Sequence, residues 1–138
     1  MNRKLLGLVE EGSGSLFESR IGIGKGYCGK EQDAGGKRHG PNGIADPEVW
    51  VIGVQDTKGN WRACLFKYAL HSTFHHADNF FVSAEYSGHI RRYLAGCKPG
   101  MVFLFAQGTS GNQSPRYFRY GRGKKSVGRV ESIGCLAD

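Results

Sequence analysis

With 138 residues the chain fits a single domain that can bury a core of its own. Glycine fills 22 positions, more than twice the usual share of about 7%, which predicts many turns and irregular segments. The formal net charge of +7 is compatible with anionic partners, and we expect neither a transmembrane segment nor a signal peptide, because no apolar run has the required length. The four cysteines lie more than thirty residues apart, which argues against a zinc ribbon and fixes neither redox state nor compartment.

The N-terminal third is expected to contain a short helix, a strand and a long loop. Residues 3–11 have the pattern of the end of a helix, which the Gly-Ser-Gly at 12–14 breaks. Residues 19–28, "SRIGIGKGYC", have the pattern of a glycine-rich strand. Residues 29–47 form a polar loop that is longer than a compact domain usually tolerates without a function for it.

Two strands in the middle of the chain are expected to form a hairpin. Residues 49–55 and 61–71 should pair antiparallel, because Gly59 and Asn60 supply a suitable turn. Alternation within the second strand separates two faces: Cys64, Phe66, Tyr68 and Leu70 on one, and Ala63, Leu65, Lys67, Ala69 and His71 on the other. The pattern therefore predicts that His71 ends the strand.

The following elements predict an α/β fold with a mixed β-sheet, a β-hairpin and packed helices. A helix is expected over 83–96, with Ser83 as its cap and an apolar stripe formed by Tyr86, Ile90, Tyr93, Leu94 and Cys97. Residues 101–106, "MVFLFA", are continuously apolar, as in a strand covered on both faces. The polar loop that follows opens at a strand end, where ligands gather in α/β folds.

Three histidines within "ALHSTFHHADN" raise the question of a metal site. The spacing of His71 and His75 suits a helical metal pair, but the local pattern is not helical, and His75 and His76 fall in the following loop. A histidine at a strand end can be a ligand, a general base or a hydrogen-bonded structural residue. Opposite it, the glycine-rich loop over 108–114 can offer backbone amides to an oxyanion or be an ordinary tight loop.

Two other motifs have competing interpretations. The Gly-x-Gly-x-x-Gly at Gly24, Gly26 and Gly29 lacks the helix that a dinucleotide site needs directly after it. Residues 115–129 combine six cations with three aromatic residues and no acid, a composition that can bind nucleic acid or form a solvated surface. We expect the stretch over 116–125 to be an exposed connection.

The order of these motifs resembles a known family. "ADPEVWVIGVQDTKGNWRACLFKYALHSTFHHADNFFVSAEYSGHIRRYL" and then "FLFAQGTSGNQSPR" are similar to the N-terminal catalytic domain of neutral/alkaline (non-lysosomal) ceramidases. That family has Asp-Pro-x-Val before a hairpin, a strand ending in His-Pro-Thr or His-Ser-Thr, a helix start with Ser-x-Asp, and Gly-x-x-Gly-Asp-x-Ser-Pro after a buried strand. The likeness extends from about Arg20 to Arg116.

The resemblance implies roles for individual residues. His71 corresponds to a zinc ligand, and Ser114 to a serine discussed as catalytic. The substrate or oxyanion loop is implied to contain Gly108, Gly111 and Asn112. His75 and His76 have no ligand counterpart. The implied activity is zinc-dependent hydrolysis of the N-acyl amide of ceramide to a sphingoid base and a fatty acid.

This sequence departs from the family in ways that bear on activity. Glu85 and Asn112 stand where the family has Asp, and residues 28–34 lack a common Asn-Arg-Arg. By the resemblance, one zinc histidine precedes Met1, and the glutamate and tyrosine ligands follow Asp138. Residues 1–138 are therefore expected to form a single partial domain, the middle of the catalytic domain, inactive alone.

A ceramide-like lipid is the implied substrate, association with a membrane surface is allowed, and no nucleic acid partner is expected. Two alternatives remain open from the residues. One is a small basic nucleic-acid-binding protein that uses residues 115–129, and the other is a lipid-binding module without catalysis.

Overall fold

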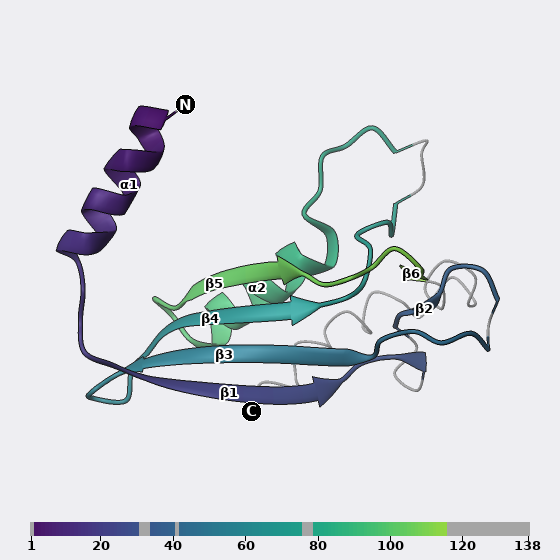
Figure 1. Ribbon diagram of the computed structural model, residues 1–138, viewed down its shortest axis with the longest axis horizontal. Helices are drawn as coiled ribbons and strands as arrows, with labels where there is room; N and C mark the ends of the chain where they lie inside the picture. Colours follow the sequence, from purple (N-terminus) through teal and green to yellow (C-terminus); the bar gives the residue numbers. More distant parts are fainter. Residues whose placement is uncertain (1, 31–33, 41, 76–78, 116–138) are drawn as a thin grey trace.

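The computed structural model describes residues 2–30, 34–40, 42–75 and 79–115 (Figure 1). Their centre is a four-stranded mixed sheet in the order β1-β3-β4-β5, with bounds Ser19–Tyr27, Glu48–Asp56, Trp61–Tyr68 and Val102–Gln107. Strand β3 pairs antiparallel with both β1 and β4, and β5 runs parallel to β4. The predicted mixed α/β fold is confirmed.

The predicted hairpin is also confirmed, with one correction. Strands β3 and β4 pair antiparallel, from Val49 opposite Tyr68 outward. Gly59 has a φ of 85°, a left-handed conformation that glycine adopts readily, and it allows the tight turn. The second strand ends at Tyr68, so the prediction that His71 ends it was wrong. Beyond Tyr68 the alternation of two faces no longer holds, and Ala69 is buried together with Tyr68 and Leu70.

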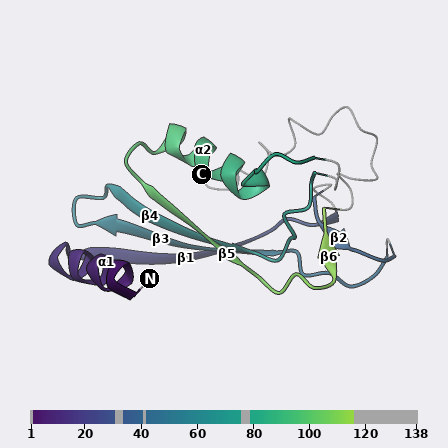
Figure 2. The ribbon, with the colours of Figure 1, turned by 90° about the horizontal axis from the view of Figure 1, so that it is seen from above.

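Helix α2, Glu85–Cys97, covers one face of the sheet, as Figure 2 shows from above. Its apolar stripe packs on rings of β4 and β5, with Tyr86 at 6.1 Å from Tyr68 and 5.5 Å from Phe105 between ring centroids. The core cluster contains Val49, Phe66, Tyr68, Leu70, Tyr86, Ile90 and Leu94. The stripe is confirmed except at Cys97, which is exposed. The helix starts two residues later than predicted, with Ala84 at the cap position.

The opposite face of the sheet is open among the described residues. Its large side chains include Ile21 and Ile23 on β1, which are 68% and 70% exposed. On β5, Val102 and Leu104 are 57% and 53% exposed. The prediction that this strand is covered on both faces was therefore wrong: β5 is an edge strand with α2 on one face only.

The N-terminal helix α1, Asn2–Gly14, stands away from the sheet (Figure 1). It continues through the glycines at 12 and 14, which were predicted to break it. The side chains described in it, over residues 3–14, are all exposed. Among the described residues, no helix has the length and apolar character needed to span a membrane.

A second, two-stranded sheet joins the long loop to the loop after β5. Strand β2, Gly36–Lys37, pairs antiparallel with β6, Gln113–Ser114. Figure 1 shows both at the end of the large sheet where β4 and β5 point. The loop over 29–47 therefore has a structural task, which is to hold the segment that contains Ser114.

Candidate functional site

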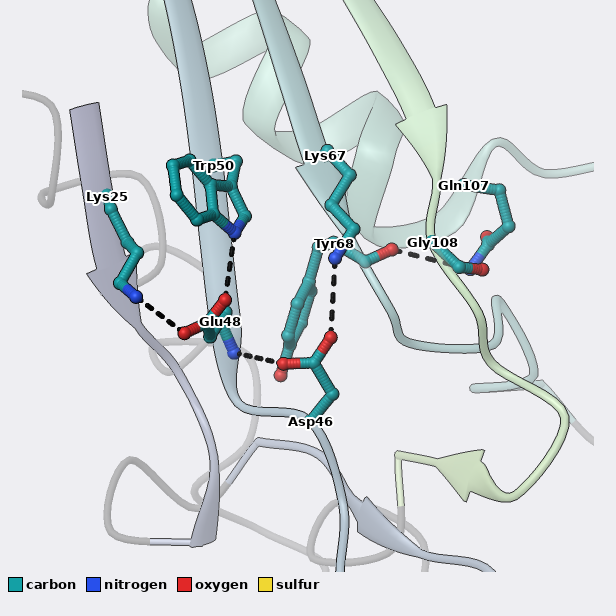
Figure 3. A network of polar contacts seen from close by, with 8 residues as sticks. All are labelled: Lys25, Asp46, Glu48, Trp50, Lys67, Tyr68, Gln107 and Gly108. Carbon is teal, nitrogen blue, oxygen red and sulfur yellow. Dashed lines mark hydrogen bonds and ion pairs between the residues drawn. The ribbon is translucent and has the colours of Figure 1, made fainter. Parts of the chain in front are cut away.

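The carboxyl ends of β4 and β5 lie side by side. The segment with His71 and the loop over 108–114 therefore start at the same end of the sheet. The strands are parallel and Tyr68 is opposite Gln107 in their register. Directly after β5, the Gly108 N–H donates to the Tyr68 carbonyl at 2.9 Å (Figure 3). A Cβ on Gly108 would lie 3.0 Å from the Ala69 Cα, so any larger residue would crowd the backbone at this close approach. The predicted meeting of strand ends is confirmed for the backbone.

His71 lies three residues beyond the end of β4 and is half-buried. The peptide before it is held from two sides, because the Leu70 carbonyl accepts from the Tyr86 hydroxyl at 3.0 Å and from Gln107 Nε2 at 3.1 Å. The His71 carbonyl itself accepts from the Thr73 N–H at 2.9 Å. The backbone at His71 is thus fixed by groups from α2, β5 and its own turn.

The segment with Ser114 is held differently, by backbone pairing in a buried place. Ser114 is 3% exposed and lies opposite Gly36 in the two-stranded sheet. Asn112 accepts from the Arg38 N–H at 2.7 Å through its carbonyl and donates through Nδ2 to the Ile44 carbonyl at 3.3 Å. The 29–47 loop therefore encloses the Ser-Pro segment.

Two amides of the loop over 108–114 already donate hydrogen bonds within the protein, so they cannot serve an oxyanion. The N–H groups of Gly108 and Gln113 donate to Tyr68 and Ser110 carbonyls, at 2.9 Å each. A Cβ placed on Gly111 meets no atom within 4 Å, so this glycine borders open space. The loop's middle, at Gly111, is the part open to a ligand, while its two ends hold the fold.

Two buried tyrosines beneath the site have raised pKa values and stay protonated at neutral pH. Burial is the main cause at both Tyr68 and Tyr86. The Tyr68 hydroxyl donates to the Cys28 carbonyl, and burial also raises the pKa of the Cys28 thiol. As neutral donors, both phenols bind carbonyls and position backbone, and neither is suited to accept a proton.

A polar network crosses the open face of the sheet toward the same edge (Figure 3). Lys67 Nζ lies 3.3 Å from Asp46 Oδ2. The other carboxylate oxygen of Asp46 accepts from the Glu48 N–H at 2.9 Å. Glu48 in turn binds Lys25 at 2.6 Å and Trp50 Nε1 at 3.0 Å. The hydrogen bond from Lys25 lowers the pKa of the half-buried Glu48 carboxyl. The charges of this network are paired within it, which suits a structural role.

A zinc site is not complete within the described residues. No group of three or more histidine, cysteine or carboxylate side chains that would suit a metal occurs among them. A half-buried imidazole suits zinc as one ligand, but a catalytic zinc takes about three from the protein. The described donor set therefore does not fit zinc by itself, and we derive no chemical step through a metal.

Two other predicted motifs are placed only in part. Gly24 and Gly26 lie within strand β1 rather than in a turn leading to a helix, so they do not form a dinucleotide-binding turn. Beyond Pro115, the basic segment lies outside the described residues, as do His76 and Cys135. The expectation of an exposed connection over 116–125 stays a prediction.

No protein-family model matches the sequence, and no curated protein is similar to it at a significant level. Solved structures are similar. The crystal structure of neutral ceramidase from Pseudomonas aeruginosa matches 92% of this chain with a TM-score of 0.69 and 24% sequence identity. A second structure, of a ceramidase complexed with C2, matches 91% with a TM-score of 0.71 and 24% identity. This chain has the fold of part of a neutral ceramidase. It spans 22% of the length of each of those chains.

Within this ceramidase fold, no sequence pattern had indicated the residues that hold the site. Gln107 was assigned to the polar loop after the strand over 101–106, and Glu85 was noted only as a departure from the family. The pairing of β2 with β6 depends on two residues in each strand, too few for alternation to be recognised. The unusual length of the 29–47 loop was the one feature of the sequence that indicated a role for this loop, which contains β2.

Proposed function

We propose that this chain is part of a ceramidase-like, zinc-dependent amidohydrolase that cleaves the N-acyl amide of a ceramide-like lipid. The supporting observation is the meeting of two chain segments at one sheet edge. In a fold shared with neutral ceramidases, the end of β4, just before His71, and the loop over 108–114 are joined by the hydrogen bond between Gly108 and Tyr68.

In this proposal His71 holds zinc together with ligands from outside the described residues. Zinc in hydrolases polarises a substrate carbonyl and activates water. The loop supplies polar groups around the carbonyl: Gly111 leaves room for the lipid amide, and Ser114 acts as a donor near the developing charge. Asn112 keeps the loop in place through Ile44 and Arg38.

Residues 1–138 are proposed to be one partial domain that needs further segments for activity. The reason is chemical, since one imidazole binds zinc weakly and the described residues supply no second and third ligand. We therefore expect the 138-residue chain alone to hold less than one zinc per molecule and to hydrolyse ceramide negligibly.

The test is an assay of the complete gene product with an N-acyl sphingosine whose acyl chain is fluorescent. We expect release of the labelled fatty acid, loss of release after dialysis against a zinc chelator, and recovery on adding zinc. Release that persists without metal would contradict the zinc dependence. Absence of release from a folded, zinc-loaded protein would contradict the ceramidase-like activity.

A further inference from the structure

Glu85, the first residue of α2, has a backbone conformation that its position in the helix does not require. Its φ is 47°, in the left-handed region that non-glycine residues rarely adopt, at a cost of about 1–3 kcal/mol. An acidic residue in the first helical turn is favoured by the helix dipole with ordinary backbone angles as well. The strain at Glu85 therefore needs a compensating interaction.

That interaction is with the turn after His71. The Glu85 carboxylate accepts from the Phe74 N–H at 3.0 Å through one oxygen, and from the His75 N–H at 3.3 Å through the other. Such bonds to an ionised acceptor are stronger than neutral ones. The neighbouring side chain adds packing, because the rings of Tyr86 and Phe74 lie 5.7 Å apart.

His71 thus sits between two fixed points. Before it, the Leu70 carbonyl uses two donors, the Tyr86 hydroxyl and Gln107 Nε2. After it, the amides of Phe74 and His75 are bound by one carboxylate. Holding the backbone on both sides fixes the direction of the His71 Cα–Cβ bond and the neighbours that limit its χ1 rotamers, and a metal ligand needs such preorganisation.

We propose that Glu85 is a positioning residue that sets the direction of the His71 imidazole by binding the turn at Phe74 and His75. The inference rests on the proposed function only in taking His71 as the functional side chain. Glu85 would then stabilise the turn after His71, in addition to being the first residue of α2.

The experiment compares Glu85→Gln, Glu85→Gly and Ser83→Ala in the full 138-residue chain by nuclear magnetic resonance. Glutamine removes the charge, and glycine removes the carboxylate while tolerating the left-handed backbone. Ser83→Ala is the matched control, because Ser83 Oγ accepts from the Glu85 N–H at 3.0 Å, a bond at the start of the helix that leaves the Glu85 carboxylate in place. The readouts are hydrogen exchange of the Phe74 amide, three-bond couplings that report the His71 χ1 angle, and the unfolding midpoint.

Both Glu85 variants should exchange the Phe74 amide roughly ten- to a hundredfold faster, as expected for loss of a bond to a charged acceptor, and His71 should populate several χ1 rotamers. Ser83→Ala should lower the unfolding midpoint and leave His71 in one rotamer. A single, unchanged His71 rotamer in Glu85→Gln and Glu85→Gly would overturn the proposal, and so would equal loss of the rotamer in Ser83→Ala.

A second measurement separates this inference from the proposed function. In the complete gene product, Glu85→Gln should weaken zinc binding by about ten- to a hundredfold, the usual effect of losing a group that orients a ligand. If the wild-type protein binds no zinc while the rotamer result holds, the proposed function fails and the positioning of His71 stands. If zinc binds through His71 and Glu85→Gln leaves both rotamer and affinity unchanged, the positioning role alone fails.

Discussion

The end of β4 and the end of β5 lie at the same edge of the sheet but present their candidate residues in opposite ways. His71 is half-buried, and side chains of α2 and β5 hold the carbonyl of Leu70 directly before it. Ser114 is 3% exposed and sits in a strand whose backbone pairs with β2. The first arrangement leaves a ring available to a ligand, whereas the second encloses a hydroxyl.

This difference bears on which residue is reactive. A metal ligand has to direct its ring at a cavity shared with other ligands, and a turn fixed only through its backbone allows that. A serine nucleophile has to meet both a base and the substrate carbonyl, whereas a donor to a developing charge has to meet the carbonyl alone, so the enclosure of Ser114 opposite Gly36 restricts a nucleophile more than a donor. Under the proposed function, we therefore assign His71 to the contact with the reacting centre and Ser114 to a supporting role as a donor.

The largest expected effect is on His71. In the complete gene product, His71→Ala should reduce ceramide hydrolysis to background, because a zinc site that loses one of three or four ligands binds its metal poorly. His75→Ala is the matched control: it removes an exposed ring four residues away and keeps the N–H that binds Glu85. Initial rates of fatty acid release measure both. Equal losses in the two variants would remove the distinction between the histidines.

A smaller effect is expected at Ser114. Ser114→Ala should slow hydrolysis by about 10²–10³-fold, the usual result of losing a donor to a developing oxyanion, with the zinc content unchanged. The rates and the metal content are measured on the same preparation. Total loss of activity with zinc intact would instead identify Ser114 as a nucleophile and reverse the assignment above.

Two glycines of one loop test how tightly the two strand ends are joined. Gly108→Ala should lower the free energy of unfolding by about 1–3 kcal/mol, because its Cβ would lie 3.0 Å from the Ala69 Cα and 2.8 Å from the Lys67 Cε. Gly111→Ala should change it by less than about 0.5 kcal/mol, since open space surrounds that position. Urea unfolding measures both variants. If both are equally stable, the close contact between the loop and β4 is wrong.

The smallest effect concerns the β3–β4 turn, far from the site. The Asp56 carboxylate binds the side chain and backbone of Asn60 and the Lys58 N–H, and the Asn60 side chain is the main cause of its lowered pKa. A lowered pKa means that the stabilisation is present above the ordinary value of about 3.9 and is lost as the pH falls through the folded value. Asp56→Asn should thus lower the melting temperature slightly at pH 7, with the difference shrinking below about pH 4, whereas Thr57→Ala should show no such pH dependence.

The elements with strong local patterns were predictable, as was the hairpin that a short turn imposes, whereas the number of layers and the contacts between distant segments were not. Strict alternation over Cys64, Phe66 and Tyr68 identified the buried face of β4, and the stripe on α2 identified the helix surface that covers it. The run over 101–106 was misassigned as doubly covered, because a continuous apolar stretch does not reveal whether a second layer is present.

The position of His71 shows the same limit at the level of the site. Alternation extended the strand by three residues, because Ala69, Leu70 and His71 are compatible with β-structure. What ends the strand is tertiary: the Leu70 carbonyl binds Tyr86 and Gln107 in place of a neighbouring strand. Such bonds depend on residues that are 16 and 37 positions away, and no local pattern encodes them.

The most direct test of the account is the zinc content of the complete gene product after dialysis against a weak chelator. The wild-type protein and His75→Ala should each retain one zinc per molecule, while His71→Ala should retain almost none with its fold intact by circular dichroism. Full zinc retention in His71→Ala would contradict the central claim that His71, in the segment after β4, is a metal ligand.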